Sequence, residues 1–113
     1  MLPSSKTKES RREQEMQIPE EIIRALAEIR EAESNIPADE LKLIERVSFD
    51  RGKVSVKYHC VSPFCPMMLV LAMGLDMKER LLKLECVKEA NVSVVNHYMA
   101  EQINSKLDGF MSS

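Results

Sequence analysis

Residues 53–75, "KVSVKYHCVSPFCPMMLVLAMGL", contain a change of hydrophobic period that decides the fold. In the first part, apolar and polar side chains alternate along the chain. The apolar face consists of Val54, Val56, Tyr58 and Cys60. Strict alternation is typical of a strand that is buried on one face. After Pro66, apolar residues recur with the spacing of a broad helical face. The stretch therefore predicts a strand, a short loop and a helix.

The residues before this strand show a second alternation that ends at a turn. In residues 40–49, Val47 and Phe49 alternate with polar neighbours, and Gly52 follows in the turn. Two alternating segments joined by a short turn that contains Gly are typical of a β-hairpin. Because the second face of the hairpin is polar, we expect a sheet that is covered on one side only.

Further periodic segments complete the predicted order of elements. Residues 19–33 carry an apolar stripe with helical spacing, and the helix after the hairpin extends over residues 66–84. Residues 91–95 alternate like a third strand, and residues 98–110 form a short amphipathic helix. The sequence thus predicts an α/β (α+β) two-layer sandwich of order α-β-β-α-β-α. We expect a small mixed three-stranded sheet with the helices packed on one face.

Length and composition fit one domain with short tails. The chain has 113 residues, and its first 16 residues are polar, with Lys, Arg and Glu interleaved. Chain ends of this kind are commonly mobile. We therefore expect a mobile polar N-terminal tail at residues 1–16, a single domain at residues 17–110 and a C-terminal tail at residues 111–113.

Charge and hydropathy disfavour several classes of protein. The net charge is −2, whereas nucleic-acid-binding domains usually present a basic surface, so no nucleic-acid partner is expected. No apolar run approaches the roughly 18 residues of a membrane span, so no membrane partner is expected either. The first residues lack the apolar core of a signal peptide, and their acids disfavour a mitochondrial presequence. We therefore expect a cytoplasmic protein with reduced thiols, and an odd number of cysteines agrees with that.

Cys65 is the cysteine whose position suggests chemistry. Pro66 suits the first position of a helix, which places Cys65 at the N-cap. Unpaired backbone N–H groups and the positive end of the helix dipole favour a thiolate there. A thiolate is the form that attacks electrophiles and binds metals, but the same position also suits a plain helix cap. Cys60 and Cys86 are interpreted as packing residues, and Cys60 is not expected to pair with Cys65.

The ligands for a permanent metal site are incomplete. Structural zinc and iron–sulfur sites usually need four Cys or His ligands, and the chain has three Cys and two His. If Cys65 binds metal, we expect other ligands from a second protomer or a partner protein. His97 is a further candidate ligand, because it would reach Cys65 if the second and third strands are parallel. A capping or surface histidine fits the same position.

No enzyme activity is expected from these residues. A Cys/His pair can support nucleophilic catalysis when a third group orients the histidine. Neither an acidic orienting residue nor an oxyanion motif accompanies Cys65 and His97 in the sequence.

The stretch around Cys65 resembles a known family. "VSPFCPMM" is similar to the T-T-P-x-C-P-M signature of PaaD-like or MIP-type small iron–sulfur cluster assembly proteins. The residues that match this signature in order are Ser62, Pro63, Cys65, Pro66 and Met67. "HYMAEQINSKL" resembles the tail of the same family, with His97, Asn104 and Leu107 in place. The resemblance extends over residues from about 20 to 108.

The chain departs from the family pattern after the first helix. Where the family often carries Asp-Pro-Glu, this chain has Glu31, Ala32 and Glu33, so that only Glu33 is kept literally. Within the resemblance, Glu33 and Asn104 are therefore the supporting residues outside the cysteine motif.

The resemblance implies a function in iron–sulfur cluster assembly and maturation. Such a factor would act as an adaptor or transient carrier that delivers clusters to apoproteins, with Cys65 binding a transient iron–sulfur cluster or iron. Its partners would be an iron–sulfur scaffold or carrier and client apoproteins, and a homodimer is a further expected assembly. The alternative is an interaction module without metal inside a multiprotein complex, in which all cysteines serve packing.

Overall fold

The computed structural model describes residues 18–109. The tails predicted at residues 1–16 and 111–113 lie outside the described residues, so those two predictions are not addressed by the structure. The elements within the described range are α2 (Glu20–Ala27), β1 (Ile44–Asp50), β2 (Lys53–Tyr58), α3 (Met67–Leu82), β3 (Glu89–Val94) and α4 (Ala100–Gly109). This order confirms the predicted α-β-β-α-β-α sequence of elements.

The three strands form one mixed sheet in the order β1-β2-β3. β1 and β2 are antiparallel, and β2 and β3 are parallel, with Val56 opposite Val92. The hairpin turn consists of Arg51 and Gly52, which have φ angles of 51° and 85°. A two-residue turn with positive φ at both positions matches the twist of the strands that it joins. The predicted hairpin is therefore confirmed.

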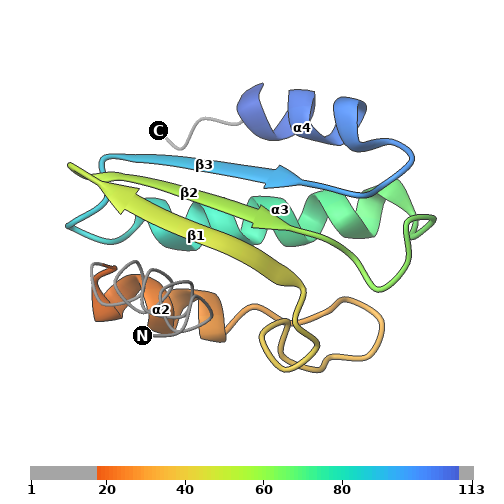
Figure 1. The fold of residues 1–113 in the computed structure, drawn as a ribbon, viewed down its shortest axis with the longest axis horizontal. Helices are drawn as coiled ribbons and strands as arrows, with labels where there is room; N and C mark the ends of the chain where they lie inside the picture. The colour runs from red at the N-terminus through yellow and green to blue at the C-terminus, as the bar shows by residue number, and fades with distance from the viewer. Residues whose placement is uncertain (1–17, 110–113) are drawn as a thin grey trace, which may run out of the picture.

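The helices form a second layer on one face of the sheet. α3 lies behind the sheet in the view of Figure 1, and α2 and α4 pack on either side of it. Buried residues alternate with more exposed ones along β2 and β3, as expected for a sheet that is covered on one side. The strand residues that enter the core are Val54, Val56, Tyr58, Ala90, Val92 and Val94.

Gly74 lets α3 approach β2 closely. The Tyr58 hydroxyl, fully buried on β2, donates a hydrogen bond of 2.7 Å to the carbonyl oxygen of Val70 on α3. A Cβ atom at Gly74 would lie 2.5 Å from this hydroxyl oxygen and 2.8 Å from Cδ2 of Leu107 on α4. Glycine at this position therefore allows α3 to pack closely against both β2 and α4.

The first helix is shorter than predicted. α2 ends at Ala27 rather than at residue 33, because the chain then folds into a tight loop. In this loop, the carbonyl oxygen of Ile29 accepts from Ala38 N at 2.8 Å, and Glu31 N donates to the Ile36 carbonyl at 2.9 Å. Ile29 has the helical spacing of the apolar stripe and is buried, but it lies beyond the end of α2. Residues 28–43 thus form a connection that sequence periodicity assigned in part to a helix.

None of the helices in the described range is long and apolar enough to cross a membrane.

Candidate functional site

The carboxyl ends of β2 and β3 place two loops side by side. Because the two strands are parallel neighbours, the loop of residues 59–66 and the loop of residues 95–99 begin at the same edge of the sheet. The backbone N–H of Tyr98 donates to the carbonyl oxygen of Pro63 at 3.1 Å. Loops at this edge of an α/β sheet are a common place for functional sites.

His97 ties the two loops together. Its ring is buried, and its Nδ1 accepts a hydrogen bond of 3.0 Å from the backbone N–H of Met99. The proton therefore resides on Nε2, which donates to the carbonyl oxygen of Cys65 at 2.8 Å. The expectation that His97 reaches the Cys65 end of the sheet is confirmed. Its contact is with the main chain of Cys65, and both ring nitrogens are engaged, so in this arrangement His97 positions the loop rather than offering a metal ligand.

Cys65 lies one residue outside the predicted cap position. α3 begins at Met67, and Pro66 is its N-cap, with its carbonyl oxygen accepting from Leu69 N and Val70 N. The prediction that Cys65 is the N-cap and Pro66 the first helical residue is therefore wrong by one position. The reason is that Pro66 adopts extended backbone angles, φ −54° and ψ 132°, which belong to a cap rather than to a helix. The thiol of Cys65 still lies next to the start of the helix.

Cys60 and Cys65 come together in the fold. Both are buried and neither forms a disulfide. Burial, and then a hydrogen bond to the Cys65 thiol, raise the pKa of Cys60 to about 12, so Cys60 retains its proton at neutral pH. The expectation that Cys60 packs in the core and forms no bridge to Cys65 agrees with the two buried, free thiols. In addition, the loop of residues 59–66 turns back and brings Cys65 to the end of β2. Cys86 lies apart from this site, beside Glu21.

Glu31 is a buried acid that the sequence interpretation passed over in favour of Glu33. Its residue is 4% exposed, and its carboxylate accepts hydrogen bonds from Ser34 N at 2.8 Å and Glu33 N at 3.1 Å. The bonds from these two backbone amides lower the pKa of Glu31. Its negative charge also contributes to the raised pKa of Cys60, so Glu31 belongs to the surroundings of the cysteine pair.

The sequence around Glu31 indicated a turn but not the part that Glu31 plays in it. Asn35 and Pro37 mark the turn, whereas side chains that accept from amides two and three residues later are typically those of Asp, Asn, Ser or Thr. Glu33 itself is exposed and contributes a backbone amide to this turn.

The remaining motif residues shape the backbone. The Ser62 hydroxyl accepts from Phe64 N at 3.1 Å, which folds the loop ahead of Cys65. The Asn104 side chain, on α4, accepts from Val94 N at 2.8 Å and donates to Val94 O at 3.1 Å. This amide thus pairs with the outer edge of β3 as another strand would. Met67, at the start of α3, is partly buried against the core.

Within residues 18–109, no group of three or more His, Cys, Asp or Glu residues could hold a metal ion. The cysteine pair therefore offers two sulfur atoms, and a site with four ligands needs the others from outside this part of the chain.

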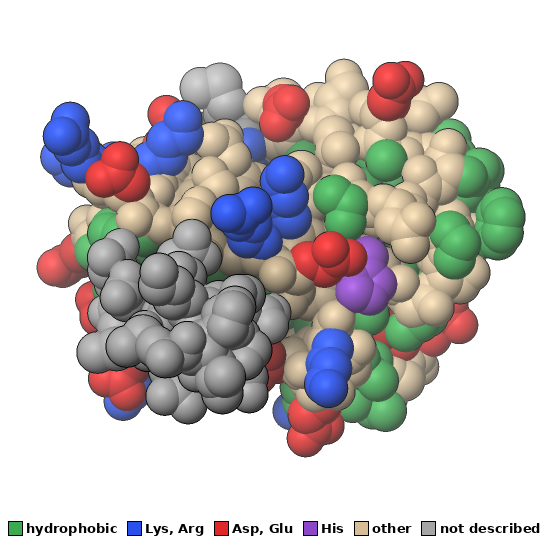
Figure 2. All heavy atoms as spheres, viewed as in Figure 1, with side chains coloured by type: hydrophobic (Ala, Val, Ile, Leu, Met, Phe, Trp, Pro, Cys, Tyr) green, Lys and Arg blue, Asp and Glu red, His purple; other side chains and the backbone are tan. Residues whose placement is uncertain are grey.

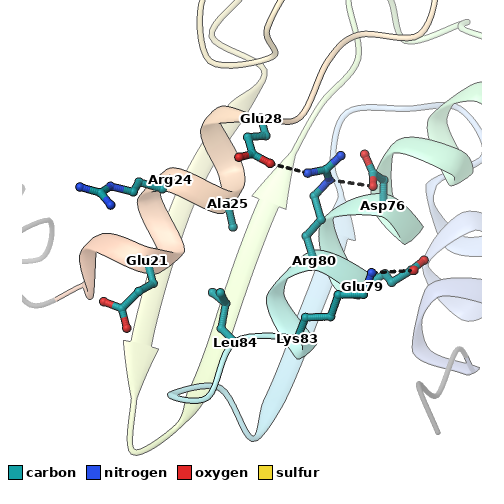
Figure 3. Close-up of a pocket in the computed structure, with 9 residues that line it drawn as sticks. All are labelled: Glu21, Arg24, Ala25, Glu28, Asp76, Glu79, Arg80, Lys83 and Leu84. Atoms are coloured by element: carbon teal, nitrogen blue, oxygen red, sulfur yellow. Dashed lines mark hydrogen bonds and ion pairs between the residues drawn. The ribbon is translucent and has the colours of Figure 1, made fainter.

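A groove between α2 and α3 is lined by side chains other than those of the cysteine pair (Figure 3). It has a volume of about 600 Å³ and a rim of charged side chains. Arg80 pairs with Glu28 at 2.6 Å and Asp76 at 2.9 Å, and Lys83 with Glu79 at 3.4 Å. Four acidic and three basic side chains line the groove, so ion pairing among them leaves a formal net charge of only −1 for a ligand. It is therefore a weaker candidate site than the Cys65 end.

Comparisons with known proteins relate the whole domain to an archaeal protein. No protein-family model matches the chain. Over 89 residues the chain is 34% identical to a protein of Methanocaldococcus jannaschii named "Uncharacterized protein MJ1129", a match that covers 78% of this chain and 92% of that protein. The chain belongs to the MJ1129 family. Because the match covers nearly all of the archaeal protein, the similarity extends over a whole domain rather than over one shared motif.

Proposed function

We propose that this protein is an iron–sulfur cluster assembly and maturation factor of the PaaD-like or MIP-type kind, which acts in the cytoplasm without enzymatic activity. It serves as an adaptor or transient carrier that delivers clusters to apoproteins. The cluster is its cargo, and Cys65 is the residue that holds it.

The observation that carries this proposal is the meeting of Cys60 and Cys65 at a loop edge that is anchored by His97. Two cysteine sulfurs supply part of a four-ligand set, with Cys60 releasing its proton as iron binds. An incomplete ligand set suits a carrier that must release its cargo. The motif match at residues 61–68 and the tail match at residues 97–107 support the same reading. A scaffold, a client apoprotein or a second protomer supplies the missing ligands.

Anaerobic reconstitution tests the proposal. Purified protein is incubated with ferrous iron, sulfide and a small thiol that can complete the ligand set, and bound iron and the visible absorption are measured. We expect the wild type to bind iron and Cys65→Ser to lose most of it. Cys86→Ser is the matched control, because that thiol lies apart from the site, and it should behave like the wild type.

Two results would contradict the proposal. One is equal iron binding by the wild type and Cys65→Ser. The other is no iron binding by either protein, together with normal maturation of iron–sulfur enzymes in cells that carry only Cys65→Ser.

A second candidate function is an interaction module without metal inside a multiprotein complex. The observation that favours it is the burial of Cys65, which is 5% exposed and thus also suits a packing role. Under this function, Cys65→Ala supports cell growth as well as the wild type does, whereas changes to the surface residues that contact the complex do not.

A further inference from the structure

Four large apolar side chains are exposed together at the Cys65 end of the molecule. Val61, Phe64, Met68 and Tyr98 are 57%, 73%, 69% and 61% exposed. The rings of Phe64 and Tyr98 lie 5.7 Å apart, so the loop after β2 and the loop after β3 contribute to one surface. Figure 2 shows hydrophobic side chains gathered at the edge where these two loops lie in Figure 1. We call these four residues the apolar end.

The segments that carry the apolar end contain two histidines but no fully charged side chain; His97 is buried, and His59 pairs with Glu45 at 2.7 Å. Residues 59–75 and 90–100 have no Asp, Glu, Lys or Arg, although 30% of the whole chain is charged. A charged group docked here would lose water without gaining an opposite charge from these segments, which is unfavourable. An uncharged apolar group would instead gain from burial against the exposed side chains. The surface is thus matched to a partner segment without charge.

The size of the apolar end favours a short segment over a second folded copy. A large aromatic side chain offers roughly 150–250 Å² for burial, so four side chains with these exposures present on the order of 500 Å². A stable interface between two folded proteins usually buries about 800 Å² on each side. Patches of roughly 300–600 Å² are at the upper end of what monomers expose and often bind a ligand.

We propose that the apolar end binds an uncharged, apolar segment of a partner polypeptide. Phe64 and Tyr98 form an aromatic pair, and the flexible Met68 side chain adapts to the shape of the segment. Phe64 directly precedes Cys65, so a docked segment lies beside the cysteine pair. The inference rests on the proposed function for the role of that partner as a client, but the docking itself needs no metal.

Binding to an array of 12-residue peptides of random composition tests this inference. The array is probed with labelled, metal-free protein, and the strongest binders are then measured in solution by fluorescence anisotropy. We expect these peptides to be rich in Leu, Ile, Val, Met and Phe and poor in charged residues. Phe64→Ser should weaken binding about tenfold or more, because it removes most of an aromatic contact. A central Lys or Glu in the peptide should do the same.

Ile23→Ser is the matched control, because Ile23 is an exposed apolar residue of α2, 47% exposed, and lies outside the apolar end. It should change the affinity less than about twofold. The inference is overturned if no peptide binds, if charged peptides bind best, or if Ile23→Ser weakens binding as much as Phe64→Ser does.

Two further outcomes would assign the surface to another occupant and so overturn the inference. One is a dimer in sedimentation equilibrium that Phe64→Ser dissociates. The other is co-sedimentation with phosphatidylcholine vesicles that Phe64→Ser abolishes. Because all these measurements use metal-free protein, failure of docking is distinguishable from failure of iron binding at Cys65.

Discussion

Close packing around Gly74 leaves no room for a side chain at this position. On propensity alone, Ala in a helix interior is favoured over Gly by about 1 kcal/mol. The added Cβ would, however, lie 2.5 Å from the Tyr58 hydroxyl oxygen and would force Tyr58 or Leu107 to move. Local preference and tertiary packing therefore oppose each other at this position.

We expect Gly74→Ala to lower the free energy of unfolding by about 1–3 kcal/mol, because overpacking outweighs the gain in helix propensity. Urea unfolding measures the change. Gly109→Ala is the matched control, since a Cβ at that helix end would meet nothing within 4 Å, and it should be near neutral. Adding Tyr58→Phe should restore part of the lost stability, and no recovery would contradict the packing explanation.

Glu31 should make the free energy of unfolding of the protein depend on pH in the acidic range. Backbone hydrogen bonds lower its pKa in the folded protein below the value of about 4.3 for an unfolded chain. A carboxyl with a lowered folded pKa stabilises the protein fully above its unfolded pKa, and this contribution is lost as the pH falls through the folded pKa.

We expect Glu31→Gln to be less stable than the wild type by about 1–2 kcal/mol at pH 7, since hydrogen bonds to a charged acceptor are replaced by weaker ones. The difference should shrink as the pH falls below about 4.3, where Glu31 of the unfolded chain gains a proton, and should continue to shrink down to the lower pKa of the folded protein. Thermal unfolding between pH 7 and pH 3 measures both. Glu33→Gln is the control, because Glu33 is exposed, and a difference that stays the same from pH 7 to pH 3 would contradict the assignment.

At the scale of elements, the loop between β2 and α3 depends on a histidine that follows another strand. Two hydrogen bonds of His97 fix the loops, one to the Cys65 carbonyl and one from the Met99 amide. This cross-connection exists only because β2 and β3 are parallel neighbours. The loop therefore keeps Cys65 buried through contacts that lie 32 residues away along the chain.

We expect His97→Ala to increase the rate at which iodoacetamide labels Cys65 by about 5- to 100-fold. Each lost hydrogen bond favours local opening by roughly 0.5–1.5 kcal/mol, and a buried thiol reacts from the open state. Peptide mapping by mass spectrometry reports the rate at each cysteine separately. The rate at Cys86 is the internal control, and an equal increase there would indicate general unfolding instead of loop opening.

At the scale of the whole molecule, the element order was predictable because periodicity records which face of each element is buried. The alternation of Val54, Val56 and Tyr58 and the helical stripe after Pro66 both appear in the structure as predicted. The end of the first helix and the cap of α3 were not predicted correctly, because backbone hydrogen bonds at element ends depend on nearby loops as much as on propensity. Of the candidate site, sequence identified Cys65 and the approach of His97.

The sequence by itself determined the order of elements, the one-sided sheet and the lack of Asp, Glu, Lys and Arg in residues 59–75 and 90–100. Only the tertiary structure decided that Cys60 meets Cys65, that Glu31 lies near them in place of Glu33, and that Phe64 and Tyr98 share one surface. The physical reason is that periodicity is a local property of the chain. Contacts between side chains far apart in sequence are decided by how the loops at the end of the sheet fold back on one another.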